Sequence, residues 1–459
     1  MNTMKIKGWV FYGSVLFTAL ILAAAPSNLA LGTYRLDETQ IKAAVILIFA
    51  LVNWIVETIP VAVTSLMVIA FIPCSGIMTF SQAIEGSFGN SLFAFFLGTL
   101  ILSVAFSQTN LGRLIAIGLS AVFGKTPKAM VFAVMLSGLL LAMWVTEVAA
   151  AAIIFPIALS IVNQINDKEK RAWFGKAMML AVAWGCAFGG VATPIATGAN
   201  LIALSYLEEY CGIHITFLQW MAIGIPISLT LLAAGWFILG MLIEDNRVLQ
   251  VKEEKVLYSS REKKLTVVFL AAVFLWVVGN KLGVGSHYVA LVAAIVLFLP
   301  GIEVLHWKKT MSAISWDSIM LICSGVLIGD FLYQCGLAEM VADLFFIPSL
   351  LRQGIVLSGI YIVLTVAVLK IMFSSNTVTG VVLIPVMITL SEKVHMSPWQ
   401  LVAPCIFSSA LSLIIVTSSP VNVIPYSAKY FTPMDMVKYG VPMTLVSAVV
   451  IGIWLWIFC

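Results

Sequence analysis

Apolar runs of about 17 to 25 residues recur from one end of the chain to the other, which is the helix length that crosses about 30 Å of hydrocarbon. Only short polar segments separate these runs. Of the 459 residues, 61% are hydrophobic and 10% are charged, whereas soluble domains have roughly 25% charged residues. A soluble core has no room for this excess, so the sequence predicts an all-α polytopic membrane protein.

Two apolar stretches carry polar residues at their centres. Residues 127–165 contain Thr146-Glu147, and residues 354–391 contain the run Ser374-Ser375-Asn376-Thr377. Each half of such a stretch is too short to be an ordinary membrane span. Both stretches therefore predict re-entrant hairpins with polar tips.

Each predicted hairpin is followed by a long apolar run that small and polar residues interrupt. The interruptions are GGVATPIATGAN within residues 176–207 and TSSPVN within residues 398–428. Unwound backbone at membrane depth persists only where protein buries it or water reaches it. We therefore expect two discontinuous helices, one in each half of the chain.

The spacing of these features indicates an internal repeat. Thr146 and Ser375 are 229 residues apart, and Asn200 and Asn422 are 222 residues apart. The sequence thus predicts about 11 transmembrane helices plus two hairpins, arranged as a first half (1–243), a cytoplasmic loop (244–264) and a second half (265–459). Corresponding hairpins and broken helices in two halves are typical of a transporter's substrate site.

Basic residues favour one orientation of this arrangement. When the helices are threaded with the N-terminus in the cytoplasm, 19 of the 25 lysines and arginines fall on the cytoplasmic side. This asymmetry agrees with the positive-inside rule. We expect a multi-pass protein of the cell membrane whose two hairpins open from opposite sides, as an inverted repeat requires.

The second hairpin tip has the chemistry of an anion and cation site. Ser375, Asn376 and Thr377 place two hydroxyls and an amide where a new half-helix begins. The N–H groups and positive dipole end of a helix attract an anion. Hydroxyl, amide and carbonyl oxygens suit a small hard cation such as Na⁺.

Several segments resemble one known family, the divalent anion:sodium symporters, which carry di- and tricarboxylates or sulfate. The resemblance covers nearly the whole chain. It rests on Trp54 with Glu57-Thr58-Ile59-Pro60, Met143-Trp144, Gly189-Gly190, Thr193-Pro194, Thr197-Gly198-Ala199-Asn200, Ser375-Asn376-Thr377 and Ser418-Ser419-Pro420-Val421-Asn422.

The resemblance implies an elevator-type homodimer with a scaffold domain and a transport domain, in which each hairpin tip joins the following broken helix at a Na⁺ site. The substrate-binding residues that it implies are Ser375, Asn376, Thr377, Thr146, Thr197, Gly198 and Pro420. The implied Na⁺ ligands are Ser375, Asn376, Thr417, Ser418 and Asn422 in the better preserved second site, and Thr146, Glu147 and Asn200 in the first.

The first tip departs from the family pattern. It reads Thr146-Glu147-Val148 where the family has Ser-Asn-Thr. An ionised Glu147 repels a dianion at close range, so it must be protonated, paired with a cation or turned away. Proton coupling is one role for Glu147, because intramembrane acids often relay protons. The roles of Lys370, which lies in an apolar run, and of Asp330 stay open.

An enzyme is excluded because the four histidines are dispersed and no HExxH or GxSxG motif occurs. We expect a secondary transporter of small divalent anions, foremost C4-dicarboxylates such as succinate, malate or fumarate. Na⁺ is the expected coupling ion, with H⁺ as the alternative, and no other cofactor or nucleic-acid partner is expected. Proton-coupled uptake, uncoupled exchange, and sulfate, arsenite or cation transport remain the competing functions.

Overall fold

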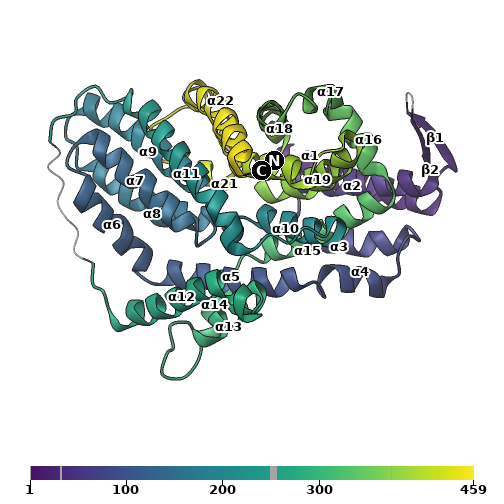
Figure 1. Cartoon of the computed structure of the whole chain (residues 1–459), viewed down its shortest axis with the longest axis horizontal. Coiled ribbons are helices and arrows are strands. Elements are labelled where there is room, and N and C mark those ends of the chain that lie inside the picture. Colours follow the sequence, from purple (N-terminus) through teal and green to yellow (C-terminus); the bar gives the residue numbers. More distant parts are fainter. Residues whose placement is uncertain (1, 32–33, 249–255, 374, 459) are drawn as a thin grey trace.

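The computed structural model describes residues 2–31, 34–248, 256–373 and 375–458. These residues form 22 α-helices, four short 3-10 helices and one two-stranded sheet. Seven of the described helices are long and apolar enough to cross a membrane, and seven more apolar helices have 10–17 residues. The predicted all-α polytopic membrane fold is confirmed (Figure 1).

The first part of the chain contains α1 (Asn2–Ala23), β1 (Asn28–Leu31), β2 (Tyr34–Asp37), α2 (Glu38–Val56), α3 (Val61–Cys74), α4 (Phe80–Ser87), α5 (Ser91–Gln108), α6 (Leu111–Phe123), α7 (Pro127–Ala142), α8 (Glu147–Asn163), α9 (Lys168–Ala192), η1 (Pro194–Ala196), α10 (Gly198–Cys211) and α11 (Phe217–Gly240).

The second part contains α12 (Ser260–Val278), η2 (Gly279–Leu282), α13 (Ser286–Val296), α14 (Trp307–Ala313), α15 (Trp316–Gln334), α16 (Leu337–Phe345), α17 (Pro348–Leu351), α18 (Ile355–Leu369), η3 (Lys370–Met372), α19 (Asn376–Val394), α20 (Pro398–Ala410), η4 (Val416–Ser418), α21 (Pro420–Tyr426) and α22 (Pro433–Phe458).

Capping boxes begin α2 in the first part and α12 in the second. Asp37 and Gln40 cap each other at the start of α2, and Ser259 and Glu262 do the same at α12. Each box satisfies backbone N–H groups that a helix start leaves free. Because the second box begins α12 at Ser260, the predicted loop 244–264 ends earlier than expected, and its residues 249–255 lie outside the described residues.

A small antiparallel hairpin, β1 paired with β2, was not expected from the sequence. It occupies the polar segment between α1 and α2 and lies at one end of the molecule (Figure 1, right). The hydroxyl of Tyr34 donates a hydrogen bond of 2.6 Å to the Asp343 carboxylate of α16. This bond attaches the hairpin to the second part of the chain.

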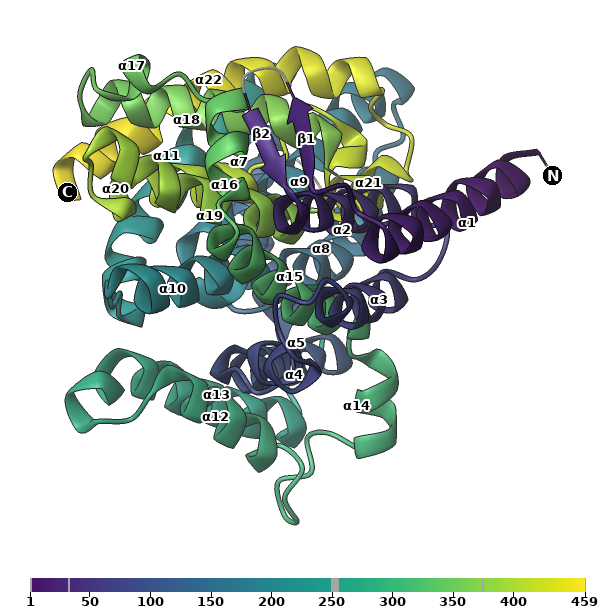
Figure 2. The same cartoon turned by 90° about the vertical axis from the view of Figure 1, so that its right-hand side faces the viewer.

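Helices of the first part pack against helices of the second. Helix α5 packs against α13, and α15 packs against α3. With α5, the helices α12, α13 and α14 lie along one edge of the molecule, at the bottom of both Figure 1 and Figure 2. Helix α9 is central, because 94% of its most apolar stretch is buried, against 39% for α22.

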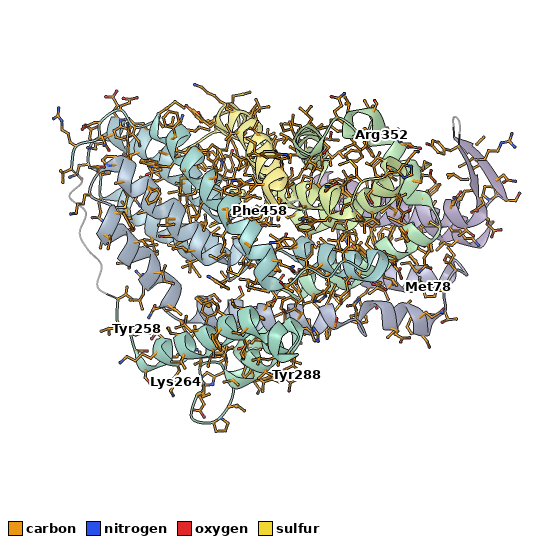
Figure 3. All side chains as sticks on the ribbon, viewed as in Figure 1. Met78, Tyr258, Lys264, Tyr288, Arg352 and Phe458 are labelled. Carbon is orange, nitrogen blue, oxygen red and sulfur yellow. The ribbon has the colours of Figure 1, made fainter. Side chains whose placement is uncertain are left out.

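Residues that the threading assigns to opposite membrane faces lie far apart in the structure. Tyr258 and Lys264, assigned to the cytoplasmic side, lie toward the left end of the molecule in Figure 3. Arg352, which the same threading places on the outer side, lies toward the right. Residues assigned to the two sides of the membrane thus lie toward opposite ends of the long axis of the molecule.

Helix α22 passes so close to the break before α21 that one position tolerates no side chain. A Cβ atom at Gly440 would lie 1.9 Å from the Leu413 carbonyl oxygen. We predict that Gly440→Ala lowers the free energy of unfolding by about 1–3 kcal/mol, because overpacking moves backbone. Thermal unfolding of the purified protein measures this loss. Gly118→Ala on α6 is the control, since a Cβ there has nothing within 4 Å, and equal unfolding temperatures for the two variants would contradict the prediction.

Candidate functional site

Two helical hairpins bring their tips into the interior. In the first, α7 ends at Ala142 and α8 begins at Glu147; in the second, α18 and η3 lead to α19, which begins at Asn376. Thr146 caps α8 by accepting a hydrogen bond of 3.4 Å from the Ala149 N–H. Ser375 caps α19 in the same way. Each tip thus presents a helix N-terminus, whose N–H groups and dipole favour negative charge.

The first helix break follows the first hairpin and is held by one asparagine. Helix α9 ends at Ala192, and α10 begins at Gly198 with Thr197 as its cap. The amide Nδ2 of Asn200 donates to the carbonyl oxygens of Gly190 and Thr193, both at 2.9 Å. These bonds satisfy backbone carbonyls that the broken helix leaves without partners.

The second break repeats this pattern. The amide Nδ2 of Asn422 donates to the carbonyl oxygens of Ser412 at 2.7 Å and Ile415 at 3.3 Å. These acceptors lie ten and seven residues before the asparagine, as Gly190 and Thr193 do before Asn200. Both breaks therefore have the same internal hydrogen-bond geometry.

The two hairpin tips contact each other directly. The Asn376 amide donates to the Glu147 carboxylate at Oε1. On its other side, Asn376 Oδ1 accepts a hydrogen bond of 3.0 Å from the Ser412 hydroxyl. Glu147, Asn376 and Ser412 are at most 7% exposed. One buried asparagine thus joins both tips and the second break.

The first break also approaches both tips. A Cβ atom at Gly190 would lie 3.2 Å from Glu147 Oε2, and one at Gly198 would lie 3.0 Å from the Thr377 hydroxyl. Helix α10 packs against α19, and α21 packs against α8. Each broken helix therefore contacts the hairpin of the other half.

Three buried oxygen atoms in this cluster have no hydrogen-bond partner among the described residues. They are Glu147 Oε2, Asn200 Oδ1 and Asn422 Oδ1. A buried oxygen without a partner is costly. Carboxylate and amide oxygens are ligands for hard cations such as Na⁺, so the donor atoms present fit the expected ion.

The cluster also contains a buried lysine. Lys370 is 2% exposed, and its ammonium donates to the Ser409 carbonyl oxygen near the end of α20. With Ser412 and Ser418, it lines a small cavity beside the second break. Each hairpin thus carries one buried ionisable group near its tip, the Glu147 carboxylate in the first and the Lys370 ammonium in the second.

Not every predicted site residue lies inside the cluster. Thr417 and Pro420 are on the second break but have exposed side chains. Ser418 is buried, and its hydroxyl donates to the Ile415 carbonyl at 2.6 Å. Asp330 lies on α15, where its carboxylate accepts a hydrogen bond from Gln334.

Sequence reasoning missed Ser412, although Ser412 is a direct partner of Asn376. It also missed Thr193, whose hydroxyl donates to the Met143 carbonyl before the first tip. The repeat contains a signal for both residues. Ser412 lies 222 residues after Gly190, and Thr193 lies 222 residues before Ile415, the same spacing that separates the two asparagines.

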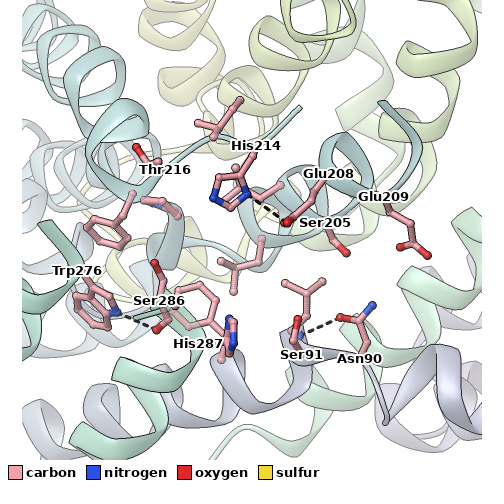
Figure 4. A pocket seen from close by; sticks show the side chains of 18 of the residues that line it. Asn90, Ser91, Ser205, Glu208, Glu209, His214, Thr216, Trp276, Ser286 and His287 are labelled. Atoms are coloured by element: carbon pink, nitrogen blue, oxygen red, sulfur yellow. Dashed lines mark hydrogen bonds and ion pairs between the residues drawn. The ribbon is translucent and has the colours of Figure 1, made fainter. Parts of the chain in front are cut away.

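A larger cavity lies between the cluster and one surface of the molecule. It has a volume of about 490 Å³ and is lined by residues of α5, α10, α11, α12 and α13, with Pro194 of η1. Figure 4 shows His214 paired with Glu208, at 3.2 Å, on one side of it and His287 on the other. Pro194 belongs to the first break, so the cavity borders the break at this residue.

The family model described as the sodium:sulfate symporter transmembrane region matches residues 9–459. The chain belongs to this family, the divalent anion:sodium symporters. Its members are transporters, which excludes an enzyme. The expectation drawn from the sequence motifs is confirmed, and the chain is a multi-pass membrane transporter of this family.

Characterised members of the family are similar over most of their length. A sodium-dependent dicarboxylate transporter of Staphylococcus saprophyticus is 25% identical over 98% of this chain and 90% of its own. A transporter of the same name from Staphylococcus aureus is 26% identical over 87% of this chain and 82% of its own. These names support sodium as the coupling ion in the family.

Two solved structures share the fold at lower identity. The Alcanivorax borkumensis YdaH transporter has a TM-score of 0.57 and 14% identity, covering all of this chain and 99% of its own. The MtrF protein of Neisseria gonorrhoeae has a TM-score of 0.52 and 12% identity, covering 98% of this chain and 97% of its own. At this identity the likeness concerns the fold alone.

Proposed function

We propose that the protein carries C4-dicarboxylates such as succinate, malate or fumarate across the cell membrane together with Na⁺. The observation that carries the proposal is the meeting of two helix N-termini, capped by Thr146 and Ser375, around the buried Asn376 amide. Two N-termini supply N–H donors and positive dipole ends to two carboxylates. The names of the staphylococcal relatives support the same substrate class and ion.

Glu147 gives this site a physical reason for coupling. Two like charges about 5 Å apart repel each other by about 3 kcal/mol at an effective dielectric constant of 20. A dicarboxylate near an ionised Glu147 is therefore disfavoured until a cation neutralises that carboxylate. Na⁺ held by Glu147 Oε2 and Asn200 Oδ1, both unpaired among the described residues, removes the repulsion. Anion binding then requires the cation.

The proposed Na⁺ ligands lie at the hairpin tip and the helix break of each repeat. The first repeat supplies Thr146, Glu147 and Asn200, and the second supplies Ser375, Asn376, Ser418 and Asn422. The sequence favoured the second site. Glu147 gives the first site a buried carboxylate, and Lys370 places a buried ammonium beside the second, so we propose the first repeat as the stronger Na⁺ site.

We further propose a cytoplasmic N-terminus, a homodimeric assembly and an elevator movement, as the family resemblance implies. In this orientation the 490 Å³ cavity opens toward the outside. We propose that the substrate enters the site through this cavity.

Uptake of labelled succinate into proteoliposomes tests the function. We expect an inward Na⁺ gradient at constant pH to drive accumulation without internal substrate. A pH gradient without Na⁺ is the second arm, because the buried Glu147 carboxylate also suits proton coupling, and preloaded dicarboxylate is the third. Accumulation in the second or third arm alone would replace Na⁺ symport by proton coupling or exchange, and sulfate as competitor tests the anion class.

A further inference from the structure

Lys370 lies where the family resemblance implies a cation. Its ammonium donates to the Ser409 carbonyl in the last turn of α20, and it shares a cavity with Ser412 and Ser418 of the second break. The C-terminal end of a helix carries free carbonyls and the negative end of the dipole. An ammonium there is stabilised by the same carbonyls and dipole end that would stabilise a bound Na⁺.

The first repeat has the opposite arrangement. The residue 229 positions before Lys370 is Leu141, which is apolar and buried. Two unpaired buried oxygens, Glu147 Oε2 and Asn200 Oδ1, lie in this repeat, whereas the second repeat has only Asn422 Oδ1 among the described residues of the cluster. The second repeat thus has a buried ammonium where the first has an apolar side chain, and the first has a buried carboxylate at Glu147 where the second has the amide of Asn376.

The regions around these two charged groups are also connected. Asn376 connects the two regions, because it bonds to Glu147 on one side and to Ser412, which lines the same cavity as Lys370, on the other. A mobile cation beside the buried ammonium is disfavoured by like-charge repulsion. The same cation beside Glu147 is favoured.

We propose that the Lys370 ammonium is a tethered cation that replaces one of the two Na⁺ ions of the transport site. One mobile Na⁺ then binds per cycle, in the first repeat, next to Glu147. This inference rests on the proposed Na⁺-coupled function, and it adds to it a fixed stoichiometry and a positioning role for Lys370.

The test is the dependence of succinate uptake on Na⁺ concentration in proteoliposomes. For the unaltered protein we expect a Hill coefficient of about 1, since the coefficient cannot exceed the number of coupled sites. For Lys370→Ala we expect at least about tenfold lower uptake at low Na⁺, because the second break loses its fixed positive charge. Raised Na⁺ restores this uptake with a Hill coefficient of about 2, as a second ion fills the vacated position.

Two matched variants complete the experiment. Lys168→Ala removes an exposed lysine from the first turn of α9 and should keep the original Na⁺ curve. Lys370→Arg keeps the charge and should keep a Hill coefficient of about 1. Methylammonium added to Lys370→Ala should restore uptake at low Na⁺, which a purely structural role of the lysine does not predict.

The outcomes separate the two proposals. A Hill coefficient of about 2 in the unaltered protein overturns the proposal that Lys370 replaces a Na⁺ ion. This test does not depend on whether the variants fold. An unchanged Na⁺ curve in Lys370→Ala overturns the same proposal. No Na⁺ dependence of uptake in the unaltered protein is instead the failure of the proposed function.

Discussion

Asn376→Ala is expected to lower the kcat/KM of anion uptake by roughly 30- to 1,000-fold. The substitution leaves the Glu147 carboxylate and the Ser412 hydroxyl, both buried, without their shared partner. Two such losses cost about 2–4 kcal/mol together, and 1.36 kcal/mol corresponds to a factor of ten in rate. Uptake kinetics in proteoliposomes with matched protein content measure the effect.

Two further variants isolate the role of Asn376. Ser412→Ala removes one of the two bonds and should cause a smaller loss than Asn376→Ala. Asn163→Ala changes an exposed asparagine at the end of α8 and should transport normally. Uptake by Asn376→Ala that equals uptake by Asn163→Ala would remove Asn376 from the proposed site.

Asn200→Leu is expected to abolish the stabilisation of the protein by Na⁺. Asn200 holds the first break through Gly190 and Thr193, and its Oδ1 is one of the unpaired buried oxygens. A ligand at 100 times its Kd stabilises the folded state by about 2.7 kcal/mol, and leucine of similar size offers no oxygen. Thermal unfolding in NaCl and in KCl at equal ionic strength measures the difference.

The control for this variant is Asn246→Leu, on an exposed connection after α11 where Asn246 accepts a hydrogen bond from the Lys128 N–H. It should retain the full difference between NaCl and KCl. If Asn200→Leu shows the same difference as the control, Na⁺ does not bind at the first break. A general destabilisation by Asn200→Leu is distinguished from loss of Na⁺ binding, because it would also lower the unfolding temperature in KCl.

Apolar run length was sufficient to predict the fold class, because crossing a membrane imposes a fixed helix length on the sequence. Helix ends were less accessible. Helix α9 begins at Lys168, eight residues before the apolar run that predicted it, because Asp167 caps a polar first turn. Helices α6 and α16 have 13 and 9 residues and are too short to be recognised as membrane spans, so run length alone did not reveal them.

The candidate site was predicted in part. The polar tips and asparagine-containing breaks were visible because polar residues are rare in apolar runs. The bond between Asn376 and Glu147 was not visible, since it joins residues 229 positions apart in two different hairpins. Ser412 gave no local signal either, because a serine at the end of an apolar helix is common. Its 222-residue spacing from Gly190 and its hydrogen bond to Asn376 identify it.

The asparagine at each break has a consequence for how such a molecule can bend. A hinge needs backbone torsions that are free to change, and hinges are often the terminal residues of an element. Asn200 and Asn422 each fix two carbonyls across their break, so these corners are stiff. Bending is easier where chain direction changes at exposed glycines with left-handed torsions, such as Gly212 after α10 and Gly354 before α18. The helix breaks are therefore expected to stay rigid, and bending is expected at Gly212 and Gly354 instead.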